Sequence, residues 1–206
     1  MDADVALWTA AEGRAHITEG GGAAPAKFLL EPEARFLYST SEHDPRVESL
    51  RMRVGPSWEW KSLRIPVQAY FASDRQDDAG YATELRGEIS PTPLFDIGPL
   101  QISDRNRFEL GVRRGDFLPR YENRLRLRWQ PHDWCVWPYL EDELRLDLRT
   151  GIFDQNRFYA GVALKVRHDQ RLEVAAMLRS ERTDPTWQNT LVLSFRLVLS
   201  TEPHRD

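Results

Sequence analysis

Charged side chains recur at every second position through much of this sequence. The stretch RYENRLRLRWQ, residues 120–130, puts Arg124 and Arg126 on one side of an extended strand, and Glu141 and Glu143 repeat the spacing further on. Paired carboxylates can act as a general acid and base. Beside rows of arginine they more often form ion pairs, because the planar guanidinium fits a carboxylate in a confined space. We therefore predict an ion-pair network with these members: Arg105, Arg107, Glu109, Glu122, Arg124, Arg126, Glu141, Glu143, Arg145 and Arg157.

The histidine and cysteine residues of the sequence give little support for any other catalytic chemistry. Catalysis needs a nucleophile, a base and an orienting group within reach of one another. Of the five histidines only His16 falls on a predicted strand, and no two histidines have the spacing of a metal site. The single cysteine, Cys135, excludes an internal disulfide. We expect no enzymatic activity, no bound metal and no cofactor.

The bulk composition is that of a polar chain with an unusual use of arginine. All of the 28 basic residues except Lys27, Lys61 and Lys165 are arginine, which favours carboxylate pairing in confined spaces. The net charge of -4 gives no reason to expect a nucleic-acid partner. No apolar run reaches the length of about 18 residues that indicates a transmembrane helix.

The alternation of apolar and polar residues continues along the whole chain, and no segment keeps a helical period. Clusters of glycine, proline, serine and aspartate separate the alternating segments. Such a chain is an all-β protein, and the lack of a linker indicates one domain. Eleven strands are predicted, over residues 5–17, 28–38, 50–60, 63–71, 81–90, 105–113, 120–130, 140–149, 157–167, 172–181 and 191–199.

These segments predict a single antiparallel up-and-down β-barrel over residues 1–199, followed by a tail over residues 200–206. Membrane barrels of this kind have an even number of antiparallel strands, with both chain ends on the same side, so we expect about 10 to 12 strands. The count of eleven then means that one strand is false or one is missing.

Three features favour a transmembrane barrel, with its apolar face turned toward lipid. Several segments run about 10 to 15 residues, whereas strands of globular proteins average about 5 to 6 and about 9 to 11 suffice to cross a membrane. The polar face includes small residues, which suit a crowded interior. Aromatic residues recur near segment ends, as in the interfacial girdles of membrane barrels: Tyr38, Trp58, Trp60, Tyr121, Trp129, Trp134, Trp137 and Trp187.

The predicted barrel therefore has a polar, charged lumen and an apolar outer face. Asp142 interrupts the apolar face of its strand, and a β-bulge there would reconcile it with lipid contact. The inward row carries more cations than anions, and unpaired buried charges are costly. We predict a salt-bridged lumen with little open pore, in which any residual path favours anions. The residues predicted to face lipid are Leu125, Leu127, Leu191, Leu193, Phe195 and Leu197.

One hairpin makes the inward assignment specific. The turn at residues 131–133 joins the strand of Arg124 and Arg126 to the strand of Glu141 and Glu143. Opposed side chains on neighbouring strands lie about 4.5 to 5.5 Å apart at Cβ, within the reach of an arginine–glutamate pair. We therefore expect both glutamates to contact arginines drawn from Arg124, Arg126 and Arg157.

Two other classes of protein are compatible with the alternation. A soluble, lipocalin-like barrel would turn the apolar face inward and bind an apolar ligand. An outer-membrane enzyme that modifies lipids would need a histidine near the barrel, for which His16 is the candidate. Extraction without detergent would indicate the first, and lipid hydrolysis that depends on His16 would indicate the second.

Several short motifs resemble a bacterial family, the domain of unknown function 2490. In the first part of the chain Leu7-Trp8 and the stretch from Glu33 to Arg35 suit the start of that family, and the more specific motifs come after about residue 100. These motifs are Arg105-Asn106-Arg107-Phe108, Tyr121-Glu122-Asn123-Arg124-Leu125-Arg126, Tyr139-Leu140-Glu141-Asp142-Glu143, Gln155-Asn156-Arg157-Phe158-Tyr159-Ala160-Gly161 and Trp187-Gln188-Asn189.

The resemblance implies a fold and a location rather than an activity, since members of the family are regarded as outer-membrane β-barrels. The location expected is the bacterial outer membrane. The first residues lack the basic start and apolar core of a signal peptide, as in a mature protein whose leader has been removed. Membrane lipids, or detergent in their place, are the partners expected, and the sequence points to no protein partner.

Overall fold

The computed structural model describes residues 5–16, 26–39, 44–76, 80–167, 170–183 and 186–200. Every regular element among them is a β-strand, and no described segment forms a helix long and apolar enough to cross a membrane. The strands are β1 (Val5–His16), β2 (Ala26–Ser39), β3 (Asp44–Trp60), β4 (Leu63–Gln76), β5 (Gly80–Ile89), β6 (Thr92–Ile97), β7 (Leu100–Arg113), β8 (Asp116–Trp129), β9 (Val136–Asp147), β10 (Ile152–Arg167), β11 (Gln170–Thr183) and β12 (Thr186–Ser200).

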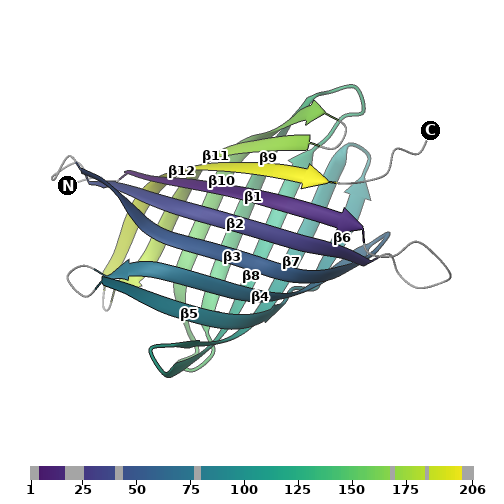
Figure 1. Ribbon diagram of the computed structural model, residues 1–206. Helices are drawn as coiled ribbons and strands as arrows, with labels where there is room; N and C mark the ends of the chain where they lie inside the picture. Colours follow the sequence, from purple (N-terminus) through teal and green to yellow (C-terminus); the bar gives the residue numbers. More distant parts are fainter. Residues whose placement is uncertain are drawn as a thin grey trace.

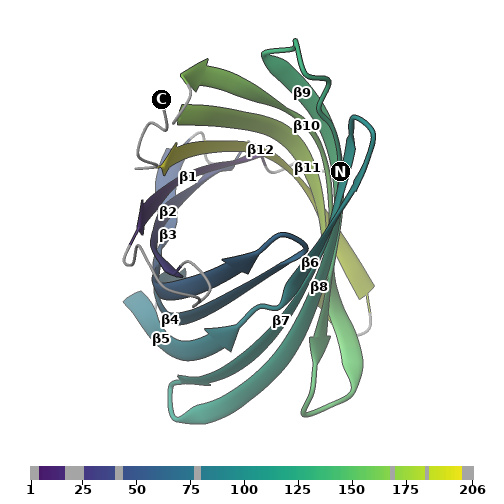
Figure 2. The ribbon, with the colours of Figure 1, turned by 90° about the vertical axis from the view of Figure 1, so that its right-hand side faces the viewer.

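The strands form one sheet that closes on itself into a barrel (Figures 1 and 2). Short β6 follows β5 after an interruption at Ser90 and Pro91, and both strands pair with β4 on one side and β7 on the other. They therefore occupy one position in the wall. The twelve labelled strands make eleven positions around the barrel, which equals the number of segments counted in the sequence but is not the even number expected.

The closing pair corrects the expected topology. β1 and β12 pair in parallel, from Val5 beside Leu191 to Arg14 beside Ser200, whereas the other pairs are antiparallel. A parallel ladder satisfies the backbone with evenly spaced, slanted hydrogen bonds, so an odd number of strands closes without leaving an edge. The expectation of a purely antiparallel barrel with an even number of strands was therefore wrong.

The parallel seam also fixes where the chain enters and leaves the barrel. β1 and β12 run in the same direction, so the start of β1 and the finish of β12 lie at opposite ends (Figure 1). We call the end where β1 starts the proximal end. The distal end is where β1 and β12 finish, and it carries the turns at residues 61–62, 98–99 and 130–135. The predicted tail, residues 200–206, lies outside the described residues apart from Ser200, the last residue of β12.

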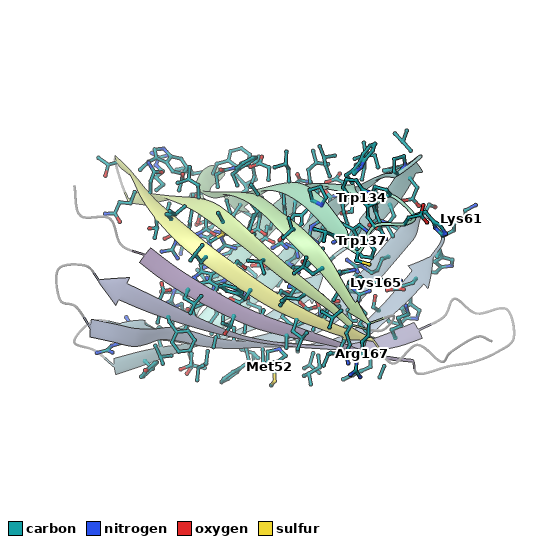
Figure 3. All side chains as sticks on the ribbon, turned by 90° about the horizontal axis from the view of Figure 1, so that it is seen from above. Met52, Lys61, Trp134, Trp137, Lys165 and Arg167 are labelled. Carbon is teal, nitrogen blue, oxygen red and sulfur yellow. The ribbon has the colours of Figure 1, made fainter. Side chains whose placement is uncertain are left out.

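Alternate side chains of each strand face the interior and the surroundings, as the period of two requires (Figure 3). Leu125 is 43% exposed on the outside of β8, whereas Glu141 on neighbouring β9 is 2% exposed. The large apolar side chains thus cover the outer face, and the charged side chains fill the lumen. A cluster of buried hydrophobic and aromatic side chains lies among the charged side chains of the lumen: Ala6, Trp8, Tyr139, Tyr159, Ala163, Ala175, Met177 and Val192.

Small residues let neighbouring side chains fit within this lumen. A Cβ on Gly161 of β10 would lie 2.5 Å from the carbonyl oxygen of Val174 and 2.9 Å from Cζ of Tyr139. Both distances are too short for a carbon atom, so the Tyr139 ring occupies space that only glycine leaves open. The close approach explains why a small residue stands on the charged face.

The β-bulge expected at Asp142 is not present. The β9–β10 ladder shifts register between Phe153 and Gln155, and Asp142 itself pairs regularly with Phe158. Asp142 therefore projects from the outer face together with its apolar neighbours. A hydrogen bond, and not a bulge, accommodates the Asp142 carboxylate on the apolar face: the Nδ2 of Asn156 donates to Asp142 Oδ1 at 2.9 Å.

Candidate functional site: the charged lumen

Glu141 and Glu143 of β9 lie between arginines of the two neighbouring strands. The register sets Glu141 beside Arg126 and Glu143 beside Arg124 on β8, with Arg157 of β10 on the other side of Glu143. The Nε of Arg124 donates to Glu143 at 2.6 Å, and Arg126 and Arg157 also bond to these carboxylates. Both glutamates are 2% exposed. The β8–β9 hairpin and the neighbouring β10 thus bring together all five residues that the sequence predicts to pair.

Four more predicted members continue the network onto β7 and β8. Arg105 bridges Glu122 and Glu143, and in the second pair N and O are 3.3 Å apart. Arg107 lies 3.2 Å from Glu122 and 3.6 Å from Glu109. Each carboxylate therefore serves more than one guanidinium, which the low exposure of this region demands.

Arg145 is the predicted member that the structure separates from the others. Its Nε and Nη2 donate to the two oxygens of Asp154, at 2.8 and 3.0 Å, in a two-pronged ion pair. Both side chains are more than a fifth exposed. The pair lies near the proximal end, where β9 finishes and β10 begins, so Arg145 belongs to the rim of the lumen and not to the buried network.

The network extends to charged residues that sequence reasoning did not single out. Arg86 of β5 contacts Glu84, Glu88 and Glu109, and the Nε of Arg53 donates to Glu88 at 2.9 Å. Their strands show the same alternation, but the pattern of residues 81–90 is weak. The signal that could have found them is the charged row Glu84, Arg86 and Glu88 at every second position.

Glu173 of β11 is a second unpredicted centre. It accepts from Nη2 of Arg128 at 2.9 Å and from Nη1 of Arg126 at 3.2 Å, and it lies 3.0 Å from Arg171. Three guanidiniums therefore share one buried carboxylate. Glu173 stands on the inward face of its predicted strand, two residues after Arg171, so the alternation contained this information.

Aromatic rings complete the pairing of arginines inside the barrel. The guanidinium carbon of Arg35 lies 3.4 Å from the ring centre of Trp8, and those of Arg157 and Arg179 approach the same ring at 5.2 and 5.7 Å. Arg86 lies 3.8 Å from the Tyr70 ring. Cation–π contacts of this kind attract a cation that has lost its water, so the rings offset part of the excess of positive charge.

Two cavities adjoin within the lumen. The larger has a volume of about 330 Å³, and its lining includes the distal residues Trp60 and Gln130. The smaller, of about 50 Å³, lies deeper, beside Trp8 and Tyr159. Arg126 lines both cavities, and the free volume is smaller beside the aromatic cluster than at the distal end.

The outer face carries the residues predicted to contact lipid. Leu125, Leu127, Leu191, Leu193, Phe195 and Leu197 all point outward and are exposed. Of the predicted aromatic girdle, Trp60 and Trp129 lie at the distal ends of their strands and Trp187 at the proximal end of β12, all exposed. Trp137 differs, because it packs against the interior cluster. The side chain of Tyr38 lies outside the described residues.

A polar patch interrupts the outer face over β7 to β10. The Nδ2 of Asn123 donates to Asp104 at 2.6 Å, and the hydroxyl of Tyr121 bonds to Asn106. The pair of Asp142 and Asn156 continues the patch on the next two strands. Leu125 lies between Asp104 and Asp142 in the ladder, and the hydrogen bonds within the patch leave few of its polar atoms without a partner.

The residues considered for catalysis or metal binding do not form a site in the described parts of the chain. The side chain of His16 lies outside the described residues, and Cys135 is exposed in the turn before β9. Among the described residues no group of histidine, cysteine and carboxylate side chains could hold a metal ion.

The fold and site define a class of protein, a closed β-barrel whose lumen is filled by ion pairs. The chain belongs to the family described as "Protein of unknown function (DUF2490)", whose model matches residues 5–190. The resemblance seen in the sequence motifs is thereby confirmed. No curated protein and no solved structure matches the chain significantly.

Proposed function

We propose that this chain is a β-barrel of the bacterial outer membrane, of a structural or narrow-channel type, with a salt-bridged arginine and glutamate lumen. The observation that carries the proposal is the outer face. Large apolar side chains on every strand position are exposed, from Leu7 on β1 to Leu199 on β12. Soluble monomers seldom expose apolar patches larger than a few hundred Å², whereas a membrane barrel requires an apolar band around its whole circumference.

The strand lengths support the same proposal. β12 contains 15 residues, which corresponds to about 50 Å at a rise of about 3.3 Å per residue. Tilted by about 45°, such a strand covers about 35 Å along the membrane normal. That length exceeds the apolar band of about 25 Å found on outer-membrane barrels. The exposed tryptophans at the strand ends suit the interfaces at the two borders of this band.

The lumen favours a structural or narrow-channel role over the alternatives. A soluble carrier of apolar ligands needs an apolar interior, but the interior here contains arginines paired with Glu141, Glu143 and Glu173. The smaller cavity, of about 50 Å³, is close to the size of one or two water molecules. A lumen of this kind supports slow passage of small solutes at most, and the lipid-modifying enzyme has no arrangement of described residues to support it.

Membrane insertion is the direct test. The protein, unfolded in urea, is diluted into phospholipid vesicles and, separately, into buffer without lipid. We expect a β-rich, protease-resistant form that floats with the vesicles, and aggregation in buffer. A monomer that folds in plain buffer and stays apart from vesicles would overturn the proposal in favour of a soluble barrel.

A further inference from the structure

The larger cavity, at the distal end of the lumen, has an excess of positive charge. Its volume of about 330 Å³ lies at the lower end of the range of small-molecule pockets. The charged groups come from strands all around the barrel. They are the arginines Arg14, Arg64, Arg105, Arg107, Arg124, Arg126, Arg128, Arg171 and Arg196, with the glutamates Glu12, Glu31, Glu59 and Glu141.

The lining glutamates already have partners within the barrel. Glu12 pairs with Arg14, and Glu59 lies 2.8 Å from the Nζ of Lys27. Glu31 accepts from the amide of Gln68 at 2.8 Å. Glu141 is shared by two arginines of β8. Each lining glutamate thus has a close partner already, and the nine lining arginines outnumber the four glutamates.

Two lining arginines remain without an ion pair. Arg64 on β4 and Arg196 on β12 form no close ion pair among the described residues, although Glu12 and Glu31 attract both guanidiniums from a greater distance. The Nε of Arg64 is buried and finds no acceptor within the described chain. Neither guanidinium is held by a close ion pair within the described barrel, so both can donate to a further anion that enters the cavity.

We propose that this distal cavity binds a small molecule carrying two or more phosphate charges, with Arg64 and Arg196 as its main ligands. A guanidinium presents a planar fork of donors that matches the oxygens of phosphate. Hydroxyl and amide groups of the lining, such as Ser103, Gln101 and Gln130, add donors around the same space. A compact polyanion offers the acceptors and the density of negative charge that the cavity lacks.

This inference rests on the barrel and its lumen, and it goes beyond the proposed membrane role. The mostly polar lining suits a phosphate group better than an acyl chain. A free phosphorylated solute and a lipid headgroup entering from the distal mouth would present the same chemistry. Tripolyphosphate and dihexanoyl phosphatidic acid below its micellar concentration are the probes that separate the two sources.

The experiment measures probe binding by calorimetry to the folded barrel in a zwitterionic detergent. We expect saturable binding of tripolyphosphate that weakens at least tenfold in Arg64→Gln and in Arg196→Gln. Arg145→Gln, which changes a rim arginine at the proximal end, should bind as the unmodified protein does. Tighter binding of the phosphatidic acid would identify a headgroup as the source, with the same dependence on both arginines.

A thermal melt without probe distinguishes a binding role from a structural one. Because neither Arg64 nor Arg196 forms a close ion pair in the described barrel, neutralising either should change the melting temperature little. A lower melting temperature with unchanged probe binding would overturn the proposal, as would binding that sodium chloride of equal ionic strength abolishes. Failure to bind any phosphate by a protein that inserts into vesicles would overturn this inference alone and leave the proposed function standing.

Discussion

Arg124 on β8 donates its Nε hydrogen to the carboxylate of Glu143 on β9, with 2.6 Å between the two heavy atoms. The two residues face each other directly in the ladder. Glu143 also contacts Arg105 and Arg157, so it neutralises guanidiniums from three strands. This carboxylate joins β7, β8 and β10 through the lumen, and the stability of that side of the barrel depends on it.

Replacing Glu143 should therefore destabilise the folded barrel strongly. Glu143→Leu leaves several buried guanidiniums short of a counter-charge, and breaking a buried pair costs about 3–5 kcal/mol. We expect a matching fall in the free energy of unfolding, measured by urea titration in detergent. Adding Arg124→Leu to the same chain should restore part of the loss, because it removes one of the uncompensated charges.

The exposed pair at the rim supplies the control for that experiment. Asp154 pairs with Arg145, and its side chain is 29% exposed. Exposed ion pairs contribute about 0–1 kcal/mol, so Asp154→Leu should change stability little. Equal losses for Glu143→Leu and Asp154→Leu would contradict the buried network.

A charge introduced on the outer face should reduce the stability of the folded barrel in lipid by an amount that depends on the neighbouring side chains. Leu193 on β12 lies between Leu7 and Ala176, so Leu193→Arg would place an unpaired cation among apolar groups. A cation at the middle of a membrane barrel costs about 2–4 kcal/mol. Leu125→Arg should cost less, because Asp104 and Asp142 flank it.

Folding titrations into vesicles measure both variants. If the order were reversed, or if neither variant lost stability in lipid, the outer face would not be in contact with the hydrocarbon core. The same variants studied in detergent show whether the protein still folds when no bilayer is present.

The crowded lumen makes Gly161 sensitive to the smallest added group. A methyl group there meets the carbonyl oxygen of Val174 at 2.5 Å, and overpacking of this kind costs about 1–3 kcal/mol. Gly161→Ala should lower the melting temperature in detergent. Gly87→Ala is the matched control, because a Cβ at Gly87 meets nothing within 4 Å; similar losses in both variants would remove the steric explanation.

Conductance should be small. The lumen narrows to a space of about 50 Å³ beside Trp8, Tyr139 and Tyr159. We expect planar-bilayer recordings to show either no steps or small ones with a preference for anions, because arginines outnumber carboxylates along the interior. A large and stable open channel of porin size would show that the salt-bridged interior is not a barrier.

The polar patch on the outer face should reduce stability in lipid. Asp142→Leu alone removes the acceptor of the Asn156 amide, and an unsatisfied polar group costs about 1–3 kcal/mol. The double variant Asp142→Leu with Asn156→Leu removes both groups, so it should fold into vesicles more stably than either the single variant or the unmodified protein. No gain for the double variant would mean that the patch does not contact hydrocarbon.

The sequence determined which side chains share a face. Alternation with a period of two follows from strand geometry alone, so the rows that contain Arg124, Arg126, Glu141 and Glu143 were predictable, as was their meeting across a tight turn. Eleven segments could be counted for the same reason, although the expected even number implied that one of them was false or that one was missing. The sequence around Asp142, by contrast, does not indicate whether a bulge or a hydrogen bond accommodates this residue, because the hydrogen bond depends on Asn156 of the next strand.

Only the tertiary structure decided how the barrel closes and which charges meet across it. The parallel pairing of β1 with β12 joins segments almost a whole chain apart, and a local pattern contains no information on such a contact. The sharing of Glu173 among three arginines and the lack of a close ion pair for Arg64 and Arg196 among the described residues likewise depend on strand stagger around the ring. Local spacing sets the direction of a side chain, whereas its partner is set by the register of strands that are distant in the sequence.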